Sequence, residues 1–257
     1  MLRNLFCIFF AAFWTAFLFP FTLVAMVFTW NTDSALWICR HWWGPGLLWA
    51  GGAKLEVIGA ENADPRRPTI YASNHQSTID IPALFTAIPV DLRFVCKKEL
   101  KYVPFIGWYL TLGKHVFVDR KNRSQSIASM EEAGRRIRSG INIIIYPEGT
   151  RSPDGRILPF KRGAFAVALK ARVPICPVTV ELSGKLMPKS SWNITPGPIR
   201  VKIGPPIDTT KFAEDDREGL ARVVRNAIIQ QSLELGGVGG DLEYAPPPSL
   251  NPAQELA

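Results

Sequence analysis

The sequence predicts an α/β fold, in which a mostly parallel, mixed sheet is flanked by helices and follows an N-terminal hydrophobic helical membrane anchor. The first observation is that short segments rich in β-branched residues alternate with helical patterns between residues 51 and 235. The second is that residues 1–50 carry only three charged side chains. The third is that polar motifs follow predicted strands, at the place where active-site loops lie in α/β sheets.

The N-terminal segment is apolar enough to contact the membrane interior. No charged residue lies between Arg3 and Asp33, and this run holds eight of the fifteen phenylalanines. A spanning helix needs about 20 apolar residues. The alternative is a cleaved signal peptide, but its apolar core is about 7–15 residues long and a small-residue cleavage site follows it, which is not evident here. Six of the eight tryptophans also lie within residues 1–50, and tryptophan favours the membrane–water boundary.

A second apolar stretch, residues 34–52, follows the first after turn-forming and helix-capping residues at 31–34. We therefore predict that residues 1–50 form a membrane-anchoring helical hairpin that enters one leaflet. The same pattern also fits one spanning helix followed by an interfacial helix, and the sequence leaves both arrangements open. Pro20 is placed where it could kink the first helix.

The body of the chain, residues 51–235, is predicted to be one α/β domain. Its seven predicted strands are short and bounded by glycine, proline or aspartate; they are Lys54–Ile58, Thr69–Ser73, Leu92–Cys96, Val116–Val118, Ile141–Tyr146, Ile175–Val180 and Ile199–Ile203. Helices are predicted by apolar residues at helical spacing; they cover residues 79–87, 122–139, 163–172 and 211–235. Residues 236–257 are rich in glycine and proline and are predicted to be a disordered tail.

The charge distribution favours an anionic partner. The formal net charge is +8, and residues 1–50 contribute +1 of it, so +7 remains for the body. A basic body on an apolar anchor suits an anionic membrane surface and anionic substrates. Nucleic acid is not an expected partner, because the aromatic residues gather in the anchor and are not interleaved with basic ones. The four scattered cysteines show no zinc-ligand spacing, which is typical of reduced thiols in a cytosol-facing body.

The stretch YASNHQSTIDIPAL, residues 71–84, joins a predicted strand to a predicted helix. Side chains five residues apart on one helix point about 140° apart. His75 and Asp80 can therefore pair only if His75 lies in the loop and Asp80 in the first helical turn. The aspartate would then fix the imidazole tautomer and stabilise its protonated form. A capping box from Ser77 to Asp80, with Asn74 as a turn residue, is an equally supported interpretation of this stretch alone.

A second polar stretch, IIIYPEGTRSPDGR at residues 143–156, predicts an anion-binding turn. Gly149 permits a tight turn, and Thr150, Ser152 and Arg151 supply hydroxyl and guanidinium donors for a phosphate or a carboxylate. Glu148 suggests a hydrogen bond to a hydroxyl group. The alternative is an ordinary polar turn after a strand.

Three further features carry less chemistry on their own. Arg120 follows a predicted strand, where an arginine is usually a solvated end residue. Residues 172–180 contain no polar chemistry and are predicted to be a buried strand that could line an apolar channel. His115 precedes an apolar run and is expected to be structural.

Taken in this order, the stretches resemble the glycerophospholipid acyltransferase family, and within it the 1-acyl-sn-glycerol-3-phosphate acyltransferases. Four blocks between about residues 50 and 205 carry the likeness. They are N-H-x4-D at Asn74, His75 and Asp80, an arginine after a hydrophobic strand at Arg120, F-P-E-G-T-R-S at residues 146–152, and V-P-x-x-P-V at residues 173–178. Tyr146 in place of phenylalanine is the main departure, and we expect it to be harmless.

The resemblance implies transfer of an acyl group from acyl-CoA or acyl carrier protein to the 2-hydroxyl of 1-acylglycerol 3-phosphate (lysophosphatidic acid), which gives phosphatidic acid in phospholipid biosynthesis. It implies that His75 is the general base, that Asp80 orients it and that no covalent acyl-enzyme forms. The implied substrate-binding residues are Asn74, Arg120, Glu148, Gly149, Thr150 and Arg151. No metal or other cofactor is implied. The catalytic domain is expected on the cytoplasmic face of a membrane, the inner membrane if the source is bacterial.

Three alternatives remain at this point. The acceptor could instead be glycerol 3-phosphate, another lysophospholipid or a lyso-ornithine lipid, because the motifs do not distinguish them. A non-catalytic membrane lipid-binding protein is disfavoured by the intact spacing of His75 and Asp80. A membrane-anchored hydrolase of the nucleophile-elbow type is disfavoured because the sequence has no G-x-S-x-G motif.

Overall fold

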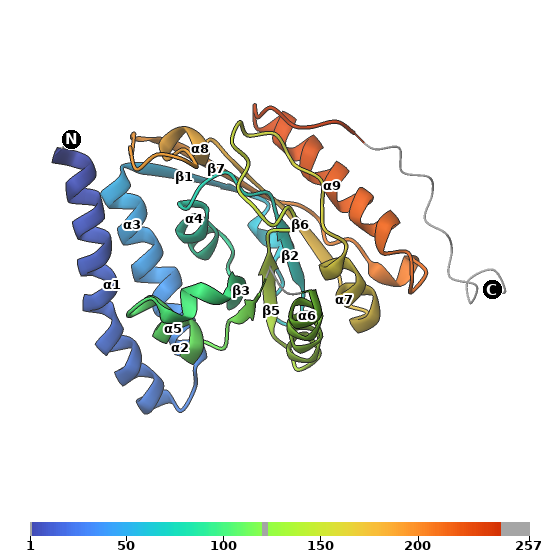
Figure 1. The fold of residues 1–257 in the computed structure, drawn as a ribbon, viewed down its shortest axis with the longest axis horizontal. Helices are drawn as coiled ribbons and strands as arrows, with labels where there is room; N and C mark the ends of the chain where they lie inside the picture. Colours follow the sequence, from blue (N-terminus) through green and yellow to red (C-terminus); the bar gives the residue numbers. More distant parts are fainter. Residues whose placement is uncertain (1, 120–122, 243–257) are drawn as a thin grey trace.

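A seven-stranded mixed sheet organises residues 2–119 and 123–242, the part of the chain that this computed structural model describes (Figure 1). The strand order is β1-β7-β6-β2-β5-β3-β4, and all neighbouring pairs are parallel except β6 and β7. The strands are β1 (Ala53–Ile58), β2 (Ile70–Ser73), β3 (Leu92–Lys97), β4 (Val116–Val118), β5 (Asn142–Ile145), β6 (Ile175–Glu181) and β7 (Gly197–Ile203). The predicted α/β class is confirmed, and each predicted strand lies within two residues of an observed one.

Helices connect the parallel strands and cover both faces of the sheet. Those predicted from periodicity are α4 (Asp80–Ala87), α6 (Arg123–Arg138), α7 (Gly163–Ala171) and α9 (Arg217–Glu234). The structure also contains short elements that the sequence did not predict. They are α5 (Ile106–Leu112), α8 (Ser183–Leu186) and the 3-10 turns η2 (Ala60–Asn62), η3 (Lys98–Tyr102) and η4 (Thr209–Lys211). These elements are too short for an apolar repeat to be visible.

The core consists of two layers, one on each face of the sheet. Along β2, Ile70 and Ala72 pack with residues of α6, α7 and α9, whereas Tyr71 packs with α4 and the N-terminal helices. This alternation follows from the two-residue period of a strand. All residues of β2, β5 and β6 are buried, as expected of central strands covered by helices on both sides.

The N-terminal residues form a helical hairpin on the edge of the domain (Figure 1). It consists of α1 (Leu2–Thr29), α2 (Asp33–Ile38), a π-helical turn η1 (Cys39–Trp43) and α3 (Gly44–Gly51). Near its start, α1 contacts the end of α3, where Arg3 Nη2 donates to the Gly51 carbonyl at 2.7 Å. Further along, Trp14 Nε1 donates to the Trp42 carbonyl at 3.1 Å, so the two arms are antiparallel. Pro20 lies within α1 without ending it.

Most of α1 is exposed although it is strongly apolar. Its buried residues are Cys7, Leu18 and Thr22, whereas Phe9 is 70% and Phe28 is 82% exposed. A helix of 28 residues is about 42 Å long, which exceeds a hydrocarbon core of about 30 Å. In the described part of the chain, α1 is long and apolar enough to cross a membrane. The exposure of this apolar helix indicates membrane association.

The first residues of the predicted disordered tail, which follow α9, are bound to the domain. Ile157 N–H donates to the Gly239 carbonyl at 2.9 Å, and Gly239 N–H donates to Ser232 Oγ at 3.2 Å. Arg225 Nη1 then donates to the Asp241 carbonyl at 2.8 Å. Residues 236–241 are therefore held against the domain by specific hydrogen bonds, which composition alone does not reveal. The remainder of the predicted tail, residues 243–257, lies outside the described residues.

Candidate active site

Three loops meet at the carboxyl edge of the sheet, because β6, β2 and β5 are adjacent and parallel. The strand β2 leads into residues 74–79, β5 into residues 146–152, and β6 into residues 182–189. The first two loops contact each other directly, since Ser152 N–H donates to the His75 carbonyl at 2.7 Å. Ligands of α/β sheets bind at this edge of the strands. The two strongest polar motifs of the sequence therefore form one site.

The structure brings His75 and Asp80 into direct contact. Asp80 is the first residue of α4 and is fully buried, and its Oδ2 lies 2.7 Å from His75 Nδ1. The same oxygen accepts backbone hydrogen bonds from Gln76 at 2.8 Å and Ser77 at 2.9 Å. His75 lies in the loop and Asp80 in the first helical turn, as pairing requires. The carboxylate also accepts from Ser77 N–H, as in a capping box, but Ser77 is not the N-cap: Ile79 precedes the first residue of α4 and makes no side-chain capping bond.

The contact with Asp80 determines which nitrogen of His75 is available. With Nδ1–H donated to the carboxylate, the lone pair lies on Nε2 and can accept a proton. The imidazole stacks on the Tyr146 ring, with centroids 3.9 Å apart and planes inclined by 14°. The Tyr146 hydroxyl is buried and has no hydrogen-bond partner in the described part of the chain. Stacking therefore uses only the ring, which a phenylalanine at this position would also supply.

Asn74 and Glu148 hold the loop in place through backbone groups. Asn74 is 1% exposed, and its amide donates to the Val180 carbonyl at 2.9 Å and accepts from Val180 N–H at 2.8 Å. Glu148 is 5% exposed; its Oε1 accepts from His75 N–H at 2.9 Å and its Oε2 from Leu158 N–H at 3.2 Å. The sequence assigned both residues to substrate binding. In the structure Asn74 binds the main chain of Val180, and Glu148 binds that of His75 and Leu158, so both residues help to hold the His75 loop in place.

The environment of Glu148 makes stability depend on pH. Burial raises the pKa of this carboxyl to about 8, against the backbone donors of His75 and Leu158, which lower it. Since the folded pKa lies above the ordinary 4.5, the contribution to stability is fully present below about pH 4.5 and is lost as the pH rises to about 8. We expect the melting temperature of the wild type to fall more steeply over this range than that of Glu148→Gln. Thermal unfolding of both proteins in the same detergent, repeated across this pH range, measures the two melting temperatures. Equal slopes of melting temperature against pH would contradict the prediction.

The turn after Tyr146 gathers hydrogen-bond donors beside the His75 loop. Gly149 has φ of 71°, which a glycine adopts without strain. Arg151 Nη1 donates to Thr78 Oγ1 at 2.9 Å. Lys189 Nζ donates to the Arg151 carbonyl at 2.7 Å and to Thr150 Oγ1 at 3.3 Å. The turn that contains Gly149, Thr150 and Arg151 thus contacts Thr78 on one side and Lys189 on the other.

One residue of the wider site lies outside the motifs, and one predicted site residue lies outside the described part of the chain. No pattern in the sequence singles out Lys189, because it belongs to no motif and the predicted strand before it contains only residues typical of a buried core. Arg120, the remaining predicted substrate-binding residue, lies outside the described residues.

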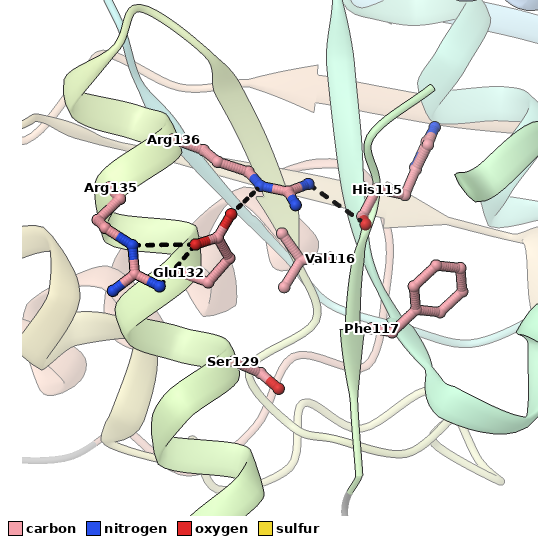
Figure 2. A pocket seen from close by; sticks show the side chains of 7 residues that line it. All are labelled: His115, Val116, Phe117, Ser129, Glu132, Arg135 and Arg136. Atoms are coloured by element: carbon pink, nitrogen blue, oxygen red, sulfur yellow. Dashed lines mark hydrogen bonds and ion pairs between the residues drawn. The ribbon is translucent and has the colours of Figure 1, made fainter. Parts of the chain in front are cut away.

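A separate hollow of about 370 Å³ lies between β4 and α6 (Figure 2). Arg135 and Arg136 both bind the Glu132 carboxylate there, and Arg136 also donates to the His115 carbonyl. The basic side chains of this hollow are therefore already paired. Its lining includes none of the candidate site residues; it consists of His115, Val116, Phe117, Ser129, Glu132, Arg135 and Arg136.

His115 itself is a structural residue in this fold. It is 2% exposed, and its Nδ1 accepts the Phe94 N–H at 2.9 Å. Burial, reinforced by Arg93 and Arg136, lowers the pKa of the imidazole to about 3. The ring therefore stays neutral at physiological pH. Among the described residues, no group of three or more His, Cys, Asp or Glu side chains is arranged to hold a metal ion.

Comparison with known proteins shows similarity over most of the chain. The acyltransferase family model matches residues 54–181. A 1-acyl-sn-glycerol-3-phosphate acyltransferase from Limnanthes alba is 35% identical over 191 residues, which are 74% of this chain and 67% of that protein. The 1-acyl-sn-glycerol-3-phosphate acyltransferase alpha of Homo sapiens is 33% identical over 194 residues, 74% of this chain and 69% of its own.

A solved structure resembles the whole molecule. The crystal structure of the 1-acyl-sn-glycerophosphate (LPA) acyltransferase from Thermotoga maritima superposes with a TM-score of 0.82 at 29% sequence identity, and the match covers 91% of this chain and 95% of that one. The family match at residues 54–181 contains the His75 loop and the Arg151 turn but ends before Lys189.

Proposed function

The chain belongs to the acyltransferase family, and from this premise we propose that it transfers an acyl group from an acyl-CoA or acyl carrier protein thioester to the 2-hydroxyl of 1-acylglycerol 3-phosphate. The product is phosphatidic acid. The observation that carries the proposal is the 2.7 Å contact between His75 Nδ1 and Asp80 Oδ2 beside the donor-rich turn at Arg151. The exposed apolar α1 supports a lipid acceptor, because it brings the site to a bilayer.

In this mechanism His75 acts as a general base. Its Nε2 takes the proton of the acceptor hydroxyl while that oxygen attacks the thioester carbonyl. The imidazolium that forms is stabilised by the Asp80 carboxylate. When the tetrahedral intermediate collapses, the carbon–sulfur bond breaks and the imidazolium returns the proton to the leaving thiolate. The new ester bond thus forms without a covalent bond to the protein.

The cysteines support direct transfer. Cys176 is buried, and this burial raises the pKa of its thiol to about 12. A thiol of this kind stays protonated at neutral pH and is a poor nucleophile. Cys176 is therefore expected to be a core residue of β6 rather than an acyl carrier.

The acceptor and the donor are tested by one assay of the purified chain in lipid micelles. Acyl-CoA and acyl carrier protein thioesters are each offered with lysophosphatidic acid, glycerol 3-phosphate, another lysophospholipid or a lyso-ornithine lipid. We expect phosphatidic acid to form when lysophosphatidic acid is present. Thioester loss without any acceptor would instead indicate a hydrolase, and lipid binding without transfer would indicate a non-catalytic protein.

We further propose that the cytoplasmic leaflet of a membrane contacts both α1 and the segment from η3 to α5. In that segment Tyr102 is 76% and Trp108 is 52% exposed. The segment continues the apolar surface of α1, because the Phe19 ring lies 5.7 Å from Phe105 and 5.6 Å from Trp108. Exposed lysines lie within this segment and beside it and suit anionic headgroups; they are Lys97, Lys101 and Lys114.

Replacing Tyr102 and Trp108 together with serine is expected to weaken binding to anionic vesicles by about tenfold or more, because two partly inserted aromatic rings are removed. Vesicle flotation over a range of lipid concentrations measures the change. Leu233→Ser is the matched control, since Leu233 is 49% exposed on α9 and belongs to a different face of the sheet. Equal binding by the double variant and the control would show that this segment stays in water.

A further inference from the structure

Lys189 comes from the connection between α8 and β7, yet its ammonium lies against the Arg151 turn. Nζ is 2.7 Å from the Arg151 carbonyl oxygen and 3.3 Å from Thr150 Oγ1. Both partners are uncharged acceptors. An ammonium has three N–H donors, so two of them are used by the turn and the third remains for another ligand.

The Thr150 and Thr78 hydroxyls and the Arg151 guanidinium also have N–H or O–H groups that remain available to a ligand. Thr150 Oγ1 accepts from Lys189, and Thr78 Oγ1 accepts from Arg151, so the hydrogen of each hydroxyl is free to be donated. Arg151 has five N–H groups, and the Thr78 hydroxyl takes one of them. These four side chains, which we call the Arg151–Lys189 cluster (Thr78, Thr150, Arg151 and Lys189), therefore offer several donors around the Arg151 turn.

The charge of this cluster is not balanced within the described part of the chain. Arg151 and Lys189 form no ion pair with a carboxylate there, whereas Arg162 binds Glu218 and Arg200 binds Glu56. The Lys189 ammonium is bound to the main chain of Arg151 and the Arg151 guanidinium to the Thr78 hydroxyl, so both positive charges belong to the same turn and an anion beside it would be attracted by each. The cluster thus fits a ligand with two negative charges and several acceptor oxygens.

The position of Lys189 is fixed from both sides. Ser77 Oγ, within the His75 loop, donates to the Met187 carbonyl at 2.6 Å. On the other side, Asn4 of α1 donates to Asn193 Oδ1 at 2.8 Å. The loop that carries Lys189 therefore lies between the His75 loop and the start of the apolar helix, where the headgroup of a lipid would meet the base.

We propose that Lys189 binds the phosphomonoester group of the acceptor lipid together with Arg151. A phosphomonoester carries about 1.5–2 negative charges at neutral pH and three strong acceptor oxygens. This matches the two cations and the hydroxyl donors of the Arg151–Lys189 cluster. The inference rests on the proposed function, and it adds a substrate-binding residue that follows the end of the family-model match at residue 181.

The test uses the full chain in lipid micelles with Lys189→Met, which keeps the length of the side chain and removes its charge. Lys189→Arg keeps the charge, and Lys185→Met removes an exposed lysine of α8 as the matched control. Transfer is measured with lysophosphatidic acid and with 1-acylglycerol, the same acceptor without its phosphate. Melting temperatures are measured with and without inorganic phosphate.

If Lys189 binds the phosphate, Lys189→Met raises KM for lysophosphatidic acid about tenfold or more, while kcat stays within about threefold. Transfer to 1-acylglycerol is then unchanged, Lys189→Arg is close to the wild type, and Lys185→Met behaves as the wild type. Equal losses with both acceptors would show that Lys189 only braces the turn. An unchanged KM for lysophosphatidic acid would remove it from the site.

The melting temperatures separate this inference from the proposed function. If the wild type makes no phosphatidic acid, but inorganic phosphate stabilises it and fails to stabilise Lys189→Met, the phosphate site stands and the assigned reaction is wrong. If phosphate raises the melting temperature of the two proteins equally, the inference is wrong whatever the reaction. Should Lys189→Met fail to fold, Lys189→Gln takes its place in both measurements.

Discussion

Replacing His75 with alanine is expected to lower turnover by about 10²- to 10⁴-fold, the usual contribution of a general base. The loop should keep its position, because it is held through main-chain atoms of residue 75. Its N–H donates to Glu148 Oε1 at 2.9 Å, and its carbonyl accepts from Ser152 N–H at 2.7 Å. Alanine retains both bonds and loses the contact with Asp80 and the stacking on Tyr146. Single-turnover rates at saturating acceptor measure the effect.

A matched control separates the loss of the base from a loss of folding. His41 is an exposed histidine of η1 whose Nδ1 lies 2.9 Å from the Trp37 carbonyl oxygen. His41→Ala removes an imidazole outside the site and should leave turnover within about twofold, since it removes no group that meets the reacting atoms. The melting temperature and vesicle binding of His75→Ala should match those of the control. Near-wild-type turnover in His75→Ala would remove this residue from the mechanism.

The sequence permits the pairing of His75 with Asp80, because both residues lie in one strand-to-helix connection, but this stretch alone supports a capping box equally well. The geometry of a helix then allows the contact only with the histidine in the loop and the aspartate in the first turn. The meeting of this loop with the Arg151 turn is different. It depends on β2 and β5 being adjacent strands, and strand order is not encoded in the motifs themselves. The family resemblance supplied that expectation.

The roles of Asn74 and Glu148 show the limit of motif reasoning. Both are polar residues of matched motifs, and polarity alone predicts contact with a substrate. Their partners are main-chain groups of Val180, His75 and Leu158, which lie far apart in the sequence. Only the folded chain shows that their side chains bind these main-chain groups. A buried carboxyl at the edge of an active site therefore positions the base through its backbone.

Tyr146 illustrates a contact that no local pattern predicts. It replaces the phenylalanine of the resembled motif, and the substitution changes only the hydroxyl group. The structure uses the ring, which stacks on His75, and leaves the hydroxyl buried without a partner among the described residues. The stacking brings together the ends of two neighbouring strands, so it depends on the same strand order as the rest of the site.

Replacing Asp80 with asparagine isolates the charge of the carboxylate from its hydrogen bonds. Oδ2 accepts from His75 Nδ1 and from the backbone of Gln76 and Ser77, whereas Oδ1 is buried without a partner in the described part of the chain. An asparagine can place its oxygen at the Oδ2 position and its amide nitrogen at the Oδ1 position. All three donors then keep an acceptor, and the negative charge that stabilises the imidazolium is lost. We expect kcat to fall about 10²- to 10⁴-fold.

The stability of the same variant should change little compared with that of Asp80→Ala. Asparagine buries one unpaired amide, at about 1–3 kcal/mol, whereas alanine leaves three buried donors unpaired, at about 1–3 kcal/mol each. Asp80→Asn should therefore fold with a modestly lower melting temperature while its kcat falls, and Asp80→Ala should lose both. Thermal unfolding and single-turnover rates of the two variants measure this separation. Wild-type turnover in Asp80→Asn would mean that Asp80 only holds the backbone of Gln76 and Ser77 in place, and that the imidazole works without a charged partner.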